Sequence, residues 1–445
     1  MPEIASPPAS TLTPAKTARQ RTDTFTSIWM IIAVAMALVT LVVKNRMPQP
    51  LWTIIHLVTL GVLSNGIFQW SWFFARSLAR LSADDPRARR HNTIRILIFN
   101  ACFLLLFVSM WLGWMVGTMI AATGIAAVAA WHGAEMLSVL RERLASRFVI
   151  VVRYYVCSAS FFVLAALLAS FVSATMFSPS IPEAMVAMRD RLTLAHALSG
   201  VAGWVGLTIG GTVITLGPTI LRTRMSPDAV SGGVRVLLPW CLSLLLAIAG
   251  ALLGVMPLVG AGILAVGTCA IVGIVYPYAK VLRNKGPREY SAWSFLLGLL
   301  WISVGVCALG VASLFVSTPS QLRALTLMWL PIIGIAGFAQ LFQGALSYLM
   351  PVVIGGGPSV VRIGIAIIDW QYSLRLGLRN SALILELFLF STSDSPSVHV
   401  LRMAGWFLVI ATFVIDVVIY AKTGVTQARA RRARSETLSE SRQVQ

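Results

Sequence analysis

The chain has 445 residues, of which 57% are hydrophobic and 11% are charged, and its formal net charge is +19. Soluble domains carry about 25% charged residues, so this composition excludes an ordinary globular protein. Apolar runs of about 20 residues, long enough to cross the hydrocarbon core of a bilayer, recur along the chain. The sequence therefore predicts an all-α polytopic membrane bundle, without the short alternating segments of a membrane β-barrel.

The high positive charge does not indicate a nucleic-acid partner. The basic residues lie in short connections between apolar segments and in the two tails, where they set topology and contact anionic lipid. We expect membrane lipids as partners, and the sequence leaves open a homo-oligomer or a redox partner. The five cysteines lie in apolar segments with no Cys-x-x-Cys pair, which predicts neither a disulfide framework nor a thiolate metal site.

The chain divides into two polar tails and one apolar domain. Residues 1–24 and 423–445 have the composition of disordered cytoplasmic tails, the second one basic, and residues 25–422 form the transmembrane domain. Within that domain we predict twelve spans. They lie near 26–44, 51–75, 93–112, 114–139, 149–176, 192–218, 236–255, 258–281, 291–316, 325–352, 364–390 and 398–421.

Charge in the connections predicts the orientation of these spans. The connections after even-numbered spans are the basic ones, as in 76–90, 141–147 and 280–288. Because positive residues favour the cytoplasm, both termini are expected on the cytoplasmic side of the membrane. The membrane is expected to be a bacterial inner (plasma) membrane. The second, sixth and tenth spans then run from the outer to the inner surface.

A repeated pattern relates those three spans. His56 and His196 each stand near the start of a long, glycine-containing apolar segment that ends in a basic cluster. Aligning "GTVITLGP" (211–218) with "GALSYLMP" (344–351) places Trp329 at the third equivalent position. Three four-helix units in a pseudo-threefold arrangement would account for twelve spans. The three side chains should then share one depth near the outer surface.

The plan resembles the catalytic subunit of heme-copper oxidases, a twelve-helix bundle with pseudo-threefold symmetry. The segment "AHALSGVAGWVGLTIGGTVITLGPTILRTRM" is also similar to bacterial membrane proteins described as copper-oxidase-like or nitrosative-stress heme-copper proteins. The resemblance implies that His56 takes a heme-ligand position and His196 a copper-ligand position, so that both are candidate metal ligands. It implies that Trp329 belongs to the same cofactor-binding region.

The chain departs from the oxidase pattern where the remaining ligands are expected. The tenth span has no histidine, although the family uses two there, and the seventh span has none for copper. A low-spin heme with two axial ligands and a three-histidine copper site cannot both be assembled in the oxidase manner. Complete oxygen reduction is therefore disfavoured, and whether the protein is an enzyme stays open.

His56 and His196 also have a simpler interpretation, as helix-start histidines at the outer interface. A second polar group, His132 and Glu135, lies three residues apart and so shares one helix face. This pair could relay protons or hold a cation. It could equally be a polar helix end beside Arg141.

The eleventh span has the densest polarity within the apolar domain. Charged residues inside a membrane usually face the bundle and pair with one another. Arg375 and Arg379 are four residues apart, Arg379 and Glu386 are seven apart, and each pair shares a helix face. Asp369 begins this series, and Asp416 in the twelfth span is an expected partner for one arginine.

These residues support two functions. The leading hypothesis is a heme- or copper-binding redox or stress protein with His56 and His196 as ligands. The alternative is a secondary transporter that uses the charges of the eleventh span. A membrane scaffold that binds no cofactor is a third interpretation.

Overall fold

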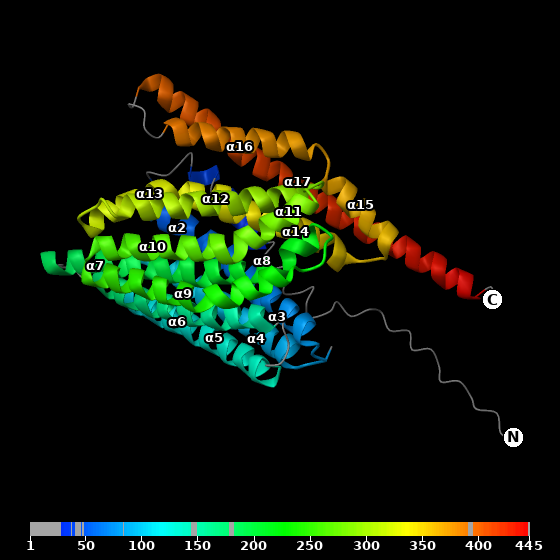
Figure 1. Cartoon of the computed structure of the whole chain (residues 1–445), viewed down its shortest axis with the longest axis horizontal. Coiled ribbons are helices and arrows are strands. Elements are labelled where there is room, and N and C mark those ends of the chain that lie inside the picture. The colour runs from blue at the N-terminus through cyan, green and yellow to red at the C-terminus, as the bar shows by residue number, and fades with distance from the viewer. Residues whose placement is uncertain are drawn as a thin grey trace. The chain divides into compact units, whose positions relative to one another are not determined.

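The computed structural model describes residues 28–36, 38–40, 46, 49–82, 84–143, 149–177, 182–389 and 395–443. Within these residues the regular elements are helices and none is a strand (Figure 1). The predicted all-α membrane bundle is therefore confirmed. The predicted tail of residues 1–24 lies outside the described residues.

The predicted spans coincide with apolar helices. Ten helical stretches in the described part of the chain are long and apolar enough to cross a membrane. Shorter apolar helices, Ile28–Thr40 and Pro358–Ile368, lie at the first predicted span and at the start of the eleventh. The chain is thus a multi-pass membrane protein. The ten stretches are Pro50–Ala79, Arg87–Leu112, Met115–Glu142, Val149–Met176, Met185–Ile220, Pro227–Leu253, Met256–Asn284, Tyr290–Ser313, Pro319–Ile354 and Pro396–Thr437.

The helices fall into two compact units, residues 1–149 and 150–445. The first contains α2 (Pro50–His56), η2 (Leu57–Ser64), α3 (Asn65–Ala79), η3 (Arg87–His91), α4 (Asn92–Leu112) and α5 (Met115–Glu142). The second contains α6 (Val149–Met176), α7 (Glu183–Ala197), η4 (Leu198–Gly206), α8 (Leu207–Ile220), α9 (Pro227–Leu253), α10 (Met256–Ala270), η5 (Ile271–Val275), α11 (Tyr276–Asn284), α12 (Tyr290–Ser313), α13 (Pro319–Pro331), η6 (Ile332–Ala339), α14 (Gln340–Ile354), α15 (Pro358–Ile368), α16 (Tyr372–Leu389) and α17 (Pro396–Gln443).

The eleventh predicted span is not one helix. The structure breaks it into α15 and α16, with Gln371 in the left-handed region at φ 48°. A break inside a membrane protein exposes carbonyl groups that need partners. The Arg375 guanidinium supplies them, because its Nε donates to the Trp370 carbonyl at 3.0 Å and its Nη2 to the Ile368 carbonyl at 2.5 Å. Sequence periodicity could not reveal this arginine cap.

The last helix is longer than the sequence suggests. Helix α17 runs for 48 residues, and the structure continues it through the segment expected to be a disordered tail. Side chains of this extension bind the end of α14: Gln427 Nε2 donates to the Pro351 carbonyl at 2.7 Å, and Arg431 Nη1 to the Ile354 carbonyl at 2.9 Å. These tertiary hydrogen bonds give the polar segment a reason to stay helical.

Three helices share an unusual feature at the positions related by the predicted repeat. A π-helical segment begins one residue after His56, two after His196 and three after Trp329. Within two residues of the last helical residue, each of these helices is followed by a residue with positive φ, namely Arg80, Arg222 and Gly355. Segments of π-helix are rare and often occur at functional sites. Two further π segments, η3 and η5, lie elsewhere, so it is the matching position of the other three that agrees with related four-helix repeats.

A hydrogen-bonded network follows the π segment in the first unit. Trp29 Nε1 donates to Asn100 Oδ1 at 2.6 Å, and Asn100 Nδ2 donates to Asn65 Oδ1 at 2.7 Å. Asn65 is the first residue after η2. Amide side chains commonly join membrane helices in this way.

The second unit contains the same network in its own helices. Trp301 Nε1 donates to Asn380 Oδ1 at 2.7 Å, and Asn380 Nδ2 donates to Gln340 Oε1 at 3.1 Å. Gln340 is the first residue after η6. A tryptophan, an asparagine and a post-π amide therefore recur with the same connectivity.

This repetition predicts matched mutational effects. We expect Asn100→Leu and Asn380→Leu each to destabilise the protein by about 1–2 kcal/mol, because each strands a tryptophan N–H and an amide in an apolar environment. Thermal unfolding in detergent measures the effect. Asn284→Leu, at the end of α11, is the control and should leave the midpoint unchanged. A large loss for only one of the two asparagines would contradict structural equivalence of the networks.

Candidate functional site

His56 ends α2 and is half-buried in the first unit. Its Nδ1 lies 2.9 Å from the Trp52 carbonyl oxygen, and its ring stacks on Trp52 with centroids 4.3 Å apart. Because a carbonyl oxygen only accepts, Nδ1 is the protonated nitrogen of this bond. In the neutral ring, the lone pair then belongs to Nε2.

His196 lies in the last turn of α7 in the second unit and bonds through the same ring nitrogen. Its Nδ1 donates to the Ala165 carbonyl of α6 at 2.8 Å. This contact fixes the same tautomer as in His56. Backbone carbonyls often hold metal-binding histidines in this orientation.

Trp329 lies on α13, which packs against the helix of His196. Arg323 Nη1 of α13 donates to Asp190 Oδ1 of α7 at 3.0 Å. The structure therefore brings the helices of His196 and Trp329 together. His56 belongs to the other compact unit. Among the residues that the structure describes, no three or more His, Cys, Asp or Glu side chains are grouped to hold a metal ion.

His132 and Glu135 lie on one helix but contact different side chains. His132 is buried, with Nε2 at 3.3 Å from Ser71 Oγ and its ring edge-on to Phe68 at 4.9 Å. Glu135 instead accepts hydrogen bonds from His91 and Trp131, at 2.7 and 2.9 Å. The pair is thus divided between an apolar core and a polar cluster.

Arg95 is the main partner of Glu135, and the sequence patterns did not indicate it. Its side chain is fully buried and forms an ion pair with Glu135. The guanidinium carbon lies 5.2 and 5.3 Å from the ring centroids of Trp72 and Trp131. A cation between two indoles gains cation–π attraction where water is excluded. A lone arginine near the start of an apolar span was the available signal.

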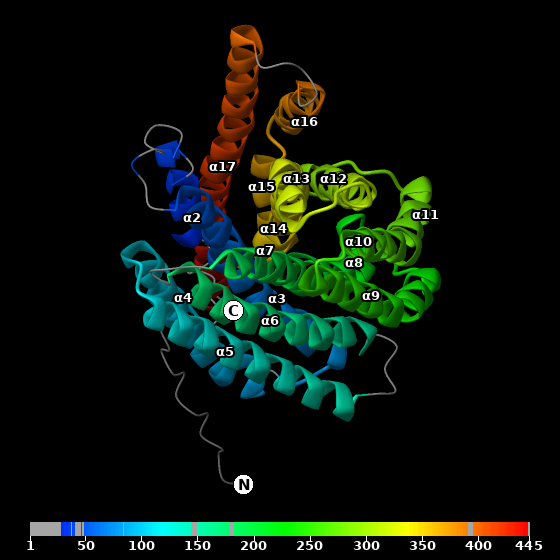
Figure 2. The ribbon, with the colours of Figure 1, turned by 90° about the vertical axis from the view of Figure 1, so that its left-hand side faces the viewer.

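The most polar interior lies between α12, α14, α16 and α17. Asp416 is fully buried, and Arg375 and Arg379 each bind one of its carboxylate oxygens. The Tyr290 hydroxyl donates to Asp416 Oδ2 at 2.7 Å. Helices α16 and α17, which carry the three charges, lie side by side (Figure 2). Asp416 was expected to pair with one arginine, and it binds both.

The rest of this ionic cluster, which we define as Tyr290, Asp369, Arg375, Arg379 and Asp416, is also well bonded. Arg379 donates from Nε to Thr412 and from Nη1 to Gln343, both at 3.0 Å. Asp369 Oδ1 accepts the backbone N–H of Tyr290 at 2.8 Å. The cluster therefore contains two guanidiniums and two carboxylates.

Glu386 does not join this cluster despite sharing a helix face with Arg379. Its carboxylate instead lies 3.7 Å from Nε of Arg402 on α17. Asp369, Arg375, Arg379 and Asp416 are brought together, whereas Glu386 forms a separate site.

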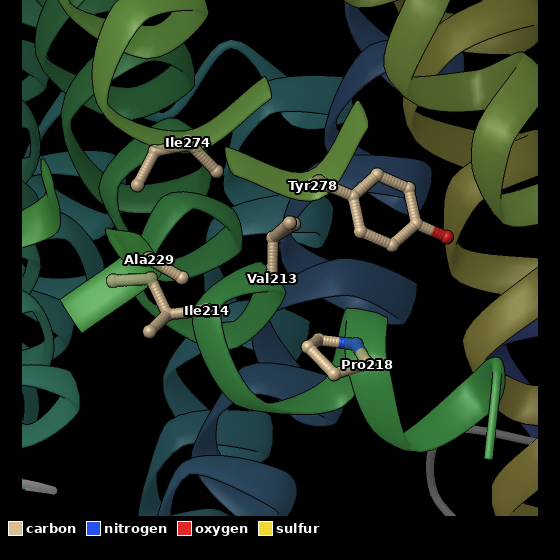
Figure 3. A pocket seen from close by; sticks show the side chains of 6 residues that line it. All are labelled: Val213, Ile214, Pro218, Ala229, Ile274 and Tyr278. Carbon is tan, nitrogen blue, oxygen red and sulfur yellow. The ribbon is translucent and has the colours of Figure 1, made fainter. Parts of the chain in front are cut away.

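An apolar cavity lies elsewhere in the second unit, between α8, α9, η5 and α11. Figure 3 shows its lining, and its volume is about 10 Å³. That is room for about one water molecule, so this cavity cannot hold an organic ligand. The lining residues are Val213, Ile214, Pro218, Ala229, Ile274 and Tyr278.

No protein-family model and no curated protein sequence matches the chain. The structural class, a multi-pass all-α membrane protein with a buried ionic cluster, therefore comes from the helices and their side chains alone.

Proposed function

We propose that the protein binds heme or copper through His56 and His196 in a bacterial inner membrane, and serves in redox chemistry, copper handling or nitrosative-stress defence. The observation that carries the proposal is shared by the two histidines. A π-helical segment begins one residue after His56 and two residues after His196, and each histidine donates Nδ1–H to a backbone carbonyl. In the neutral rings, the lone pair then belongs to Nε2, the usual ligand atom.

The donor chemistry favours heme over an oxidase-type copper centre. A three-histidine copper site needs a grouped donor set, which the described residues do not assemble. Heme carries four nitrogen ligands of its own, so the protein needs to supply only one or two axial side chains. Bound heme would supply one-electron redox chemistry. The chain would hold and orient it through an imidazole whose tautomer is fixed.

Absorption spectroscopy with metal analysis tests this proposal. Full-length protein purified from bacterial membranes should show a Soret band or stoichiometric copper. His56→Ala with His196→Ala should lower cofactor retention by at least about tenfold, because even second-shell changes cost that much. His399→Ala, at an exposed position, is the matched control and should retain the spectrum. Absence of heme and copper from the wild-type protein, or an unchanged double variant, would contradict the proposal.

The buried ionic cluster favours a second candidate, a secondary transporter. Ionised residues inside a membrane bundle often mark substrate or ion pathways. In that case, uptake of the transported solute would be lost in Arg379→Ala and retained in His196→Ala. Under the heme proposal, His196→Ala changes the absorption spectrum and Arg379→Ala leaves it unchanged.

A further inference from the structure

Glu386 differs from the other intramembrane carboxylates in how weakly it is held. Its side chain is 3% exposed, and its Oε1 has no hydrogen-bond partner among the described residues. Oε2 faces Nε of Arg402 at 3.7 Å, which is longer than a hydrogen bond. Arg402 is itself 38% exposed, so the partner of this buried carboxylate reaches toward the surface.

Asp416, on the neighbouring helix, provides the internal comparison. Both of its oxygens bind guanidinium groups, and one also accepts the Tyr290 hydroxyl. An ionised carboxylate is the form that accepts all of these bonds. Glu386 is also almost completely buried, but it faces one half-exposed guanidinium, that of Arg402, and one indole, that of Trp406.

Apolar groups and two polar side chains surround Glu386. Its Oε1 lies over Gly405, where an added Cβ would be 2.5 Å away. One turn along α16, Ala382 and Leu383 form a hydrophobic cluster with Ala336 and Val409. The facing polar groups, Arg402 and the Trp406 indole, both come from α17. Helix α12 and segment η6, which also contact α16, carry no Asp, Glu, Lys, Arg or His.

We infer that Glu386 is a proton-binding site inside the bundle, separate from the ionic cluster, which exchanges H⁺ with water on the side where Arg402 is exposed. A carboxylate without solvent needs full pairing or neutralisation. Uptake of one H⁺ from water turns the carboxylate into a neutral carboxyl and removes the negative charge that faces the Arg402 guanidinium. Half-exposed Arg402 can then be solvated, and release of the proton restores the ion pair. This inference is independent of the histidines.

Labelling with dicyclohexylcarbodiimide tests the site, because this hydrophobic reagent attacks protonated carboxyls in apolar surroundings. The full chain is reconstituted in neutral-lipid vesicles, and adducts are located by peptide mass spectrometry. We expect modification at Glu386 with at least about tenfold less at Asp416, and a rate that falls about tenfold per pH unit above the midpoint.

Two variants complete the experiment. Glu386→Gln should remove the adduct, and Arg402→Gln should raise the labelling of Glu386 several-fold because it removes the cation that favours the charged form. The detergent-unfolded chain shows that the peptide can be modified and detected. Absence of a Glu386 adduct at acidic pH in the folded protein, equal labelling of Asp416, or a rate independent of pH would overturn the inference.

Discussion

Replacing Asp416 with Asn is expected to be among the most destabilising single changes in the second unit. The variant leaves Arg375 and Arg379 buried and near one another without the carboxylate that each binds. Removing one partner of a buried ion pair costs about 3–5 kcal/mol. Thermal unfolding of purified protein, and the yield of monodisperse protein in detergent, should both fall sharply.

A second substitution distinguishes the cost of the uncompensated positive charge from the cost of altered packing. Arg379→Met added to Asp416→Asn removes one uncompensated cation while keeping an unbranched apolar side chain. We expect the double variant to recover part of the lost stability, since the two effects are coupled. A loss below about 0.5 kcal/mol in Asp416→Asn, the range of ordinary surface changes, would show that the cluster does not stabilise the fold.

In the first unit, Glu135→Ala is expected to lower the free energy of unfolding by about 3 kcal/mol, because it leaves the buried Arg95 without its carboxylate. The same change removes acceptors for His91 and Trp131. Cation–π contacts with Trp72 and Trp131 remain and offset a fraction of this loss. The measurement is the unfolding midpoint, followed through tryptophan fluorescence.

Glu142→Ala on the same helix is the matched control. Glu142 also binds an arginine, with Oε1 at 2.6 Å from Arg87, but its side chain is 49% exposed. Exposed ion pairs contribute less than about 1 kcal/mol. Equal losses in the two variants would mean that burial of Arg95 does not set the cost.

The sequence predicts the helical framework well because its signals are local. Apolar length locates the spans, and the repeated His–His–Trp spacing locates three of the five helical stretches that contain a π segment. The break at Asp369 escaped prediction because its cause is the side chain of Arg375 together with a contact from Tyr290, which is distant in sequence. Local periodicity carries no information about such partners.

The sequence identified the charged residues of the interior more successfully than it identified their partners. Arg375, Arg379 and Asp416 do meet, but Glu386 turns to Arg402 and Glu135 turns to Arg95. Helical spacing shows which residues share a face. It cannot show which neighbouring helix that face meets, because several polar partners compete for each charge. Heme or copper binding by His56 and His196 stays a prediction.

The pairing of Asp416 with two arginines also bears on how the protein is assembled in the membrane. Helix α16 contains Arg375, Arg379 and Glu386, and a charged residue at the centre of an inserting helix costs about 2.5–3.5 kcal/mol. Such a segment would partition poorly into lipid by itself. Asp416 on α17 neutralises part of this charge, so the two segments are best inserted as one hairpin, and the translocon would have to retain α16 until α17 emerges.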